Sequence, residues 1–427
     1  LMQYLGDFGD IANFTLQIAS MISAPFSSQL VDDVIAHLRG LDETAHPELA
    51  PLINMLKKQP ERHLSTEHYQ ILEEVLEIVK RVRNEDMHTF THNLYTTFLR
   101  QSCLNVLKDT LGTSDKKIIG ECIAVIAQYL HQQIENIELT HDATTRTYQK
   151  TIYLTKSLSA LLQFAHDTFG MFIHERIHIT YGLAVILGNM NRYSESLEVF
   201  DEVEKLCNVL ESSDEKQENV AMIFGEEFNL EQASIDITEG KMDVCHFRGR
   251  HEDVKALYQR ARNMVENNTQ LSVDEKDSRI IGLLNTLGNS YNKQIQVNHA
   301  IAVQKEAMEM AEKLYQRDPE IHQDIYVKTL FGMAKGHLAG LNYQAAAPFA
   351  LQAFEQTKQL ADANRSAWLG GFVNAAILYA SICSKTGENA QSIDVLTQLL
   401  PITDGLKQRN PDIWLEDHAW VVHTLTM

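Results

Sequence analysis

Proline is scarce in this sequence: it occurs eight times in 427 residues, and none lies between Pro60 and Pro319. Proline breaks the interior of a helix, because it lacks the backbone N–H and clashes with the preceding turn. The long gap therefore permits long helices, and the abundant Leu, Ala, Glu, Gln, Lys and Met favour them. No stretch alternates apolar and polar residues for long enough to indicate a sheet. We predict an all-α protein.

Basic residues are few relative to acidic ones, and the formal net charge is −20. Double-stranded nucleic acid attracts clustered Lys and Arg through counterion release, and an anionic membrane surface attracts the same residues. No basic run of five or more residues is present. No segment reaches the ~18 apolar residues that are needed to cross a bilayer. We therefore expect neither nucleic acid nor a membrane as a partner.

Paired cysteines are missing too. The five cysteines lie far apart and form no CxxC motif, which is typical of reduced thiols in the cytoplasm and argues against a zinc site built on cysteine. The apolar residues 11–26 follow Asp7 and Asp10, where a signal peptide has basic residues. We expect a cytoplasmic location. Because the chain begins with Leu1, we also expect it to be a fragment or a processed chain.

The first part of the chain indicates successive helices without a repeat. Apolar residues recur at helical spacing over residues 71–82. Asp142 to Thr145 resemble a helix start, and apolar residues continue from there through Phe164. We predict that residues 1–170 form a helical N-terminal domain of unknown role.

The second part repeats every 46 residues, in three parallel columns. The columns are Val254, Ala300, Ala346 and Ser392; Tyr258, Gln304, Ala350 and Leu396; and Ala261, Ala307, Ala353 and Leu399. A further copy, with Ser196, Phe200 and Val203, lies 58 residues upstream of the first of these, so residues 211–216 are interpreted as an insertion. Small residues let two antiparallel helices approach closely, while larger ones fill the gaps between repeats.

These columns resemble the tetratricopeptide repeat. Leu287-Gly288-Asn289-Ser290-Tyr291, followed by Ala300 and Ala307, is similar to that family's pattern. The resemblance covers residues 175–400 in about five copies, each longer than the common repeat of about 34 residues, as in kinesin-light-chain-like or Rap-like relatives. It implies a right-handed α-solenoid over residues 171–427, ending in a terminal helix or cap.

The resemblance also implies that the first helix of each repeat lines a concave groove. By register, the residues on that face are Asn285, Asn289, Lys293, Lys328, Lys335, Asn374 and Lys385. An Asn side chain donates and accepts hydrogen bonds at once, so it suits an extended peptide backbone, and nearby Lys favours an acidic segment or a C-terminal carboxylate. Asp236, Glu239 and Asp243 give the groove an acidic end.

The segment His174-Glu175-Arg176-Ile177-His178 fits the HExxH pattern of zinc hydrolases. Arg176 beside the ligands and the lack of a third ligand motif argue against catalysis, and no nucleophile elbow, phosphate loop or dinucleotide motif is present. We expect a scaffold or adaptor that holds a protein or peptide, without enzymatic activity or a cofactor. A ligand-responsive regulator resembling Rap-like peptide receptors and, less favoured, a zinc hydrolase are the alternatives. The oligomeric state stays open.

Overall fold

The structure is a computed structural model that describes residues 28–58, 116–140, 143–212 and 220–426. The helical pattern over residues 71–82 and Cys103 lie outside the described residues. The described chain divides into two compact units. Unit 1 comprises Leu1–Asn136, Tyr153–Ile179 and Val220–Phe228, and unit 2 comprises Ile137–Ile152, Thr180–Asn219 and Asn229–Met427. The division groups residues 171–179 with unit 1, while the boundary near residue 170 stays a prediction.

Unit 1 is built from helices and one small hairpin. Its elements are α3 (Ser28–Gly40), a 3₁₀ turn (Pro47–Leu49), α4 (Ala50–Lys58), α7 (Lys116–Glu135), most of α8 (Thr145–Phe169), the start of α9 (Ile173–Asn189), β1 (Val220–Ala221) and β2 (Glu227–Phe228). The predicted long helix is confirmed as α8, and the Thr144 hydroxyl accepts from the backbone N–H of Thr147 at its start. The antiparallel hairpin was not predicted from the sequence.

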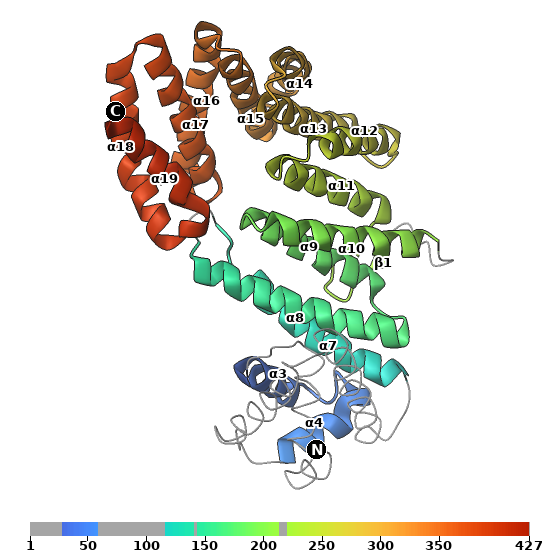
Figure 1. Cartoon of the computed structure of the whole chain (residues 1–427). Helices are drawn as coiled ribbons and strands as arrows, with labels where there is room; N and C mark the ends of the chain where they lie inside the picture. Colours follow the sequence, from blue (N-terminus) through green and yellow to red (C-terminus); the bar gives the residue numbers. More distant parts are fainter. Residues whose placement is uncertain (1–27, 59–115, 141–142, 213–219, 427) are drawn as a thin grey trace, which may run out of the picture. The chain divides into compact units, whose positions relative to one another are not determined.

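Unit 2 is a stack of antiparallel helix pairs, labelled in Figure 1. The helices are α10 (Tyr193–Glu211), α11 (Leu230–Phe247), α12 (His251–Asn267), α13 (Val273–Lys293), α14 (Val297–Arg317), α15 (Pro319–Ala339), α16 (Tyr343–Ala363), α17 (Arg365–Thr386), α18 (Asn389–Arg409) and α19 (Pro411–Thr426). From α12 to α18 the second helices begin 46 residues apart, and so do the first helices from α13 to α19. The predicted all-α solenoid and its period are confirmed.

The repeated columns mark where the two helices of each pair pack against one another. Every residue of the first column, from Val254 to Ser392, is buried, and so is Ser196 in the upstream copy. The Ser196 hydroxyl donates to the carbonyl of Ala184 at 2.7 Å, and Ser392 donates to Ala380 at 2.8 Å. A small side chain lets the two helices approach closely here, and a serine also satisfies its own hydroxyl.

The turn inside each pair requires one residue in the left-handed region. This residue has φ of 76° at Gly249, 60° at Ile295, 58° at Leu341 and 88° at Gly387, each 46 residues after the last. The next N–H then bonds back into the first helix, as from Gln296 to the carbonyl of Tyr291 at 3.0 Å. Two turns therefore place a non-glycine residue where glycine is favoured.

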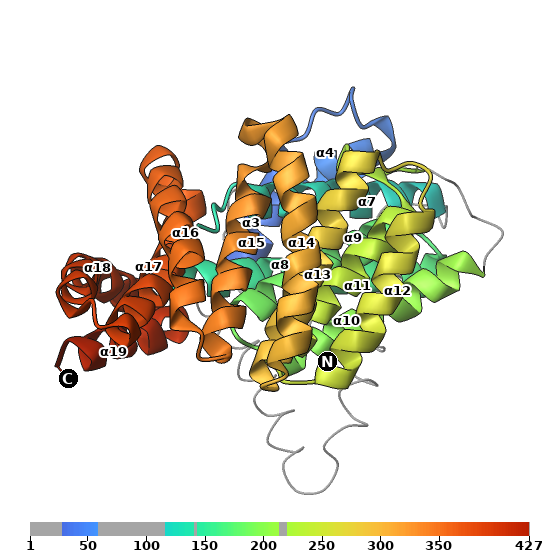
Figure 2. The same ribbon diagram turned by 90° about the horizontal axis from the view of Figure 1, so that it is seen from above.

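The first helices form one layer of unit 2 and the second helices form another. Figure 2 shows α13, α14 and α15 side by side. Each of α11, α13 and α15 contacts the next first helix, whereas consecutive second helices contact one another far less. The closer-packed layer of a curved stack lies on its inner side. The predicted site residues therefore belong to helices of the inner layer.

One described helix, α17, is long and apolar enough to cross a membrane when judged by length and composition alone. The prediction that no segment has this character was wrong for α17. More than half of its apolar window (56%) is buried, and Leu369, Val373 and Ala376 belong to a core cluster with α16 and α18. A core helix passes the same test, so this is weak evidence for a span.

Candidate ligand-binding face

The centre of the inner layer is a row of Asn side chains on successive turns of α13. The Asn285 amide donates to the hydroxyl of Thr329 on α15 at 3.1 Å, so its N–H₂ is already in use. The side-chain oxygens of Asn285 and Asn289 are buried and have no hydrogen-bond partner among the described residues. Both polar atoms of the Asn292 side chain are in the same state. Each of these atoms therefore has an unused capacity for a hydrogen bond.

Lys293 and Lys335 form a basic group beside these amides. Lys293 Nζ lies 5.4 Å from the ring centre of Phe247, and Lys335 Nζ lies 4.6 Å from that of Phe331. Both lysines stay accessible to solvent, yet burial among their neighbours lowers the pKa of each ammonium. The charge of Lys293 lowers the pKa of Lys335 further. The two cations are thus near enough for their charges to act on one another.

His246 and Asp417 both interact with the two lysines. Lys293 Nζ donates to the backbone carbonyl of His246 at 3.4 Å. Burial, together with the charges of Lys293 and Lys335, lowers the pKa of His246 to about 3, so the ring is neutral at neutral pH. Asp417, on α19, acts in the other direction, because its charge raises the pKa of Lys335. No ion pair joins Asp417 to either lysine within the part of the chain that the structure describes.

The acidic end predicted from α11 is present. Arg279 on α13 pairs with Asp236 at 2.9 Å and with Glu239 at 2.6 Å. Burial nevertheless raises the pKa of Glu239 to about 7, because it outweighs the stabilising charge of Arg279. The Asp243 carboxylate accepts from the Thr286 hydroxyl at 2.7 Å. The negative charge of the acidic end is therefore partly neutralised by Arg279 and by the raised pKa of Glu239.

The structure brings only some of the predicted residues together. Lys328 lies near the acidic end, where its charge lowers the pKa of Asp243, and it also pairs with Asp324 at 3.4 Å. Asn374 and Lys385 are exposed on α17. Among the described residues, neither has a hydrogen bond or ion pair with the Asn and Lys residues of α13 and α15. The candidate site therefore centres on α13 and α15.

Several residues of the face were missed by the sequence predictions. Phe247 lies 46 residues before Lys293, and Phe331 lies 46 residues after Asn285. The repeat register could therefore have placed both rings on the face. Asp417 was missed as well, although α19 continues the 46-residue register of the first helices.

The HExxH segment has a structural role in unit 1. Glu175 is buried and accepts from the backbone N–H of Ile223 at 3.0 Å, which ties the hairpin to α9. The His174 ring packs on Phe228 with 5.1 Å between ring centres. Arg176 is buried and donates to Asp167 at 3.0 Å. Glu175 is thus held by the hairpin backbone, which does not fit the water-activating role of a zinc hydrolase.

A family profile described as the tetratricopeptide repeat matches residues 281–321, which cover most of α13, all of α14 and the start of α15. The chain carries tetratricopeptide repeats. Proteins of this repeat class use extended surfaces to bind other proteins. The matched segment includes the Asn row of α13 and Lys293. The specific kinesin-light-chain-like or Rap-like variant stays a prediction.

Among solved structures, the chain is similar to a signal transduction ATPase with numerous domains from Pyrococcus horikoshii, a protein with a tetratricopeptide repeat sensor. The two chains are 11% identical with a TM-score of 0.39, and the match covers 94% of this chain and 65% of that one. This chain therefore spans less than two thirds of the length of that protein. A comparison with curated proteins found no match.

Proposed function

We propose that the tetratricopeptide repeats of unit 2 form a scaffold that binds an acidic segment of a protein partner. The observation that carries the proposal is the pair of exposed lysines Lys293 and Lys335, each of which lies over an aromatic ring, with the charge of Lys293 acting on Lys335. No carboxylate forms an ion pair with either lysine among the described residues. Two close ammonium groups repel each other, so an anion bound between them relieves a cost that the free protein carries.

The surroundings of the lysines favour a peptide over a small anion. The rings of Phe247 and Phe331 flank the two ammonium groups and offer apolar contact to side chains of the same segment. The unpartnered side-chain oxygen of Asn289 and the unpartnered amide of Asn292 lie on the same helix, within about one turn of Lys293. They suit the alternating donors and acceptors of an extended backbone.

The proposal is tested by fluorescence anisotropy with the full chain and a synthetic peptide. The peptide alternates Glu and Leu and ends in a free carboxylate, and two matched peptides carry Gln for Glu or an amidated end. We expect the acidic peptide to bind more tightly than the Gln peptide, with an affinity that falls as salt rises. Comparison with the amidated peptide separates side-chain carboxylates from a C-terminal carboxylate as the recognised group.

Variants assign the binding to the face. Lys293→Met with Lys335→Met should weaken binding of the acidic peptide at least tenfold, while leaving the helical circular dichroism unchanged. The matched control is Lys305→Met, because Lys305 is a 71% exposed lysine on the second helix α14. Equal loss in this control, or full binding in the double variant, would overturn the proposal.

The Asn residues give a separate readout. Asn289→Ala with Asn292→Ala should weaken the acidic and the Gln peptide by similar factors, since backbone contacts do not depend on side-chain charge. A loss confined to the acidic peptide would show that the amides do not bind the backbone. Asn285 is left unchanged, because it supports α15 through Thr329.

A further inference from the structure

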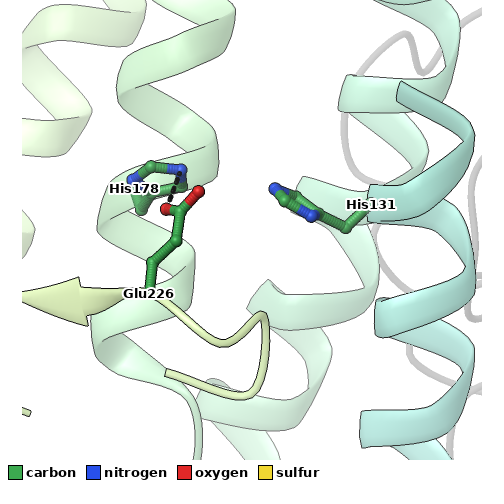
Figure 3. Close-up of side chains that lie close together, drawn as sticks. All are labelled: His131, His178 and Glu226. Carbon is green, nitrogen blue, oxygen red and sulfur yellow. Dashed lines mark ion pairs between the residues drawn. The ribbon is translucent and has the colours of Figure 1, made fainter. Parts of the chain in front are cut away.

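Three polar side chains from three separate segments of unit 1 point toward one another, as Figure 3 shows. His131 comes from α7, His178 from α9 and Glu226 from the end of the hairpin turn before β2. Each offers a ligand atom, and these atoms all lie within 4.8 Å of one another. His178 Nε2 is 3.4 Å from Glu226 Oε2. His178 is the last residue of the HExxH segment, so the fold gives it different neighbours from those that the motif implies.

The backbone around these side chains is held from both sides. The Gln128 amide on α7 donates to the carbonyl of Ile223 at 2.7 Å, and Glu175 on α9 accepts from the N–H of the same residue. Phe224 stacks on the His131 ring with 4.2 Å between centres and 8° between planes. The hairpin that carries Glu226 is therefore fixed to α7 and α9 by contacts that do not involve Glu226.

We propose that His131, His178 and Glu226 bind a divalent transition-metal ion, with zinc as the best match. Two imidazole nitrogens and one carboxylate oxygen form a recognised zinc ligand set. Zinc bonds of about 2.0–2.2 Å in a tetrahedron place the ligand atoms about 3.3–3.5 Å apart. The His178–Glu226 separation of 3.4 Å already fits this geometry, and the His131 nitrogen, which lies within 4.8 Å of the other two ligand atoms, would move closer when the ion binds.

The site is open to solvent on one side. The His131 side chain is 12% exposed, whereas those of His178 and Glu226 are 38% and 49% exposed, so an ion reaches the site from solvent. Glu135 Oε1 lies 3.9 Å from His131 Nε2 on an exposed side chain.

This site has a consequence for the hairpin rather than for the repeats. A metal that joins α7, α9 and the turn cross-links segments that are distant in sequence, and it stabilises the folded arrangement by its binding energy. The alternative is that His178 and Glu226 form an ordinary ion pair beside a stacked His131. The two cases differ in stoichiometry, in spectroscopy and in the response of the hairpin.

The test uses the full chain after treatment with a chelator, titrated with Zn²⁺ by calorimetry and with Co²⁺ by visible absorption. We expect one equivalent to bind at this site, a tetrahedral Co²⁺ spectrum that Zn²⁺ removes, and slower hydrogen exchange at the amides of Met222, Ile223 and Gly225. His178→Gln and Glu226→Gln should each weaken binding at least tenfold. Neither variant removes a buried side chain, so both should fold.

The matched control is His174→Gln, which alters the other histidine of the HExxH segment. Unchanged binding in this control, with loss in the other two variants, supports the proposed ligand set. Equal loss in His174→Gln would move the metal to the motif itself. Full binding in all three variants, or no Co²⁺ spectrum in the unaltered chain, would overturn the site.

Discussion

Two charged residues shift the pKa of Lys335 on α15 in opposite directions: Lys293 on α13 lowers it, and Asp417 on α19 raises it. Burial is the largest cause of the lowered value. The three residues come from three first helices of unit 2, so the inner layer sets the charge state of this lysine. A partner that brings a carboxylate to Lys335 would act in the same direction as Asp417.

This relationship predicts pKa changes of opposite sign in two variants. Lys293→Met removes a repulsive charge and should raise the pKa of Lys335, whereas Asp417→Asn removes an attractive charge and should lower it further. The measurement is an alkaline titration of the Lys335 Cε signal by carbon-13 NMR. Lys305→Met, on α14, is the control and should leave the curve in place. Shifts of the same sign in both variants would contradict the arrangement.

Stability is expected to rise when the strained turns are relieved. Ile295 and Leu341 have φ of 60° and 58° with side chains that are 80% and 71% exposed. A left-handed residue other than Gly or Asn costs about 1–2 kcal/mol, and little burial is lost on replacement. Ile295→Asn should therefore stabilise the fold by about 0.5–1 kcal/mol. Urea unfolding measures the change, and Asn191, with φ of 59°, is the natural precedent.

The reverse substitution checks the sign. Gly387 has φ of 88° in the equivalent turn, and no atom lies within 4 Å of the place that a Cβ would occupy. Gly387→Ala should therefore cost about 1 kcal/mol through backbone strain alone. If Gly387→Ala is neutral and Ile295→Asn is destabilising, the left-handed turns are not the source of strain.

The 46-residue period and the repeated columns could be predicted from the sequence, because every pair needs residues of similar size where its two helices cross. Ala300, Ala346 and Ser392 are small for one reason, and that reason recurs every 46 residues. The left-handed turns could not be read at Ile295 and Leu341, because the residue types there do not signal the backbone they adopt. The period was thus enough to predict where the helices lie, but not which turn residues adopt the left-handed conformation.

The candidate sites were less predictable for a different reason. On the inner face, repeat register gave Asn289, Lys293 and Lys335, but the predicted site stopped at α17 and left out Asp417 on α19. In unit 1, the hairpin strands have two residues each, too short for any periodic pattern. His131 and Glu226 are brought together only by tertiary folding, so no local motif contains both.

Helix packing in the third pair depends on a buried glutamine between two glycines. The Gln304 side chain is fully buried, and an added Cβ at Gly288 or at Gly332 would lie 2.3 Å from its amide group. Because Gln304 is confined from both sides, Gly332→Ala should destabilise the fold by about 1–3 kcal/mol. The midpoint of urea unfolding measures this loss.

A double variant separates this clash from other effects. Gln304→Ala removes the group that the new methyl meets, so Gly332→Ala should cost less in that background than alone. The next pair shows the same combination. One period later, the glutamine is replaced by Ala350, and the two glycines are replaced by the larger residues Ala334 and Leu378, all in one core cluster. Additive losses in the double variant would show that Gln304 does not oppose the alanine at position 332.

The last prediction concerns Glu239, whose pKa burial raises from 4.5 to about 7. A carboxyl whose pKa is higher in the folded state binds more protons there than when unfolded, so its contribution to stability falls as pH rises from 4.5 to 7.

Glu239→Gln removes this titration. Relative to the unaltered chain, the variant should gain up to roughly 3 kcal/mol between the two ends of that window. Unfolding by urea across the window measures the difference. Glu309→Gln, a 63% exposed control on α14, should leave the pH dependence unchanged. A constant difference between the Glu239→Gln variant and the unaltered chain would mean that Glu239 does not take up a proton near neutral pH.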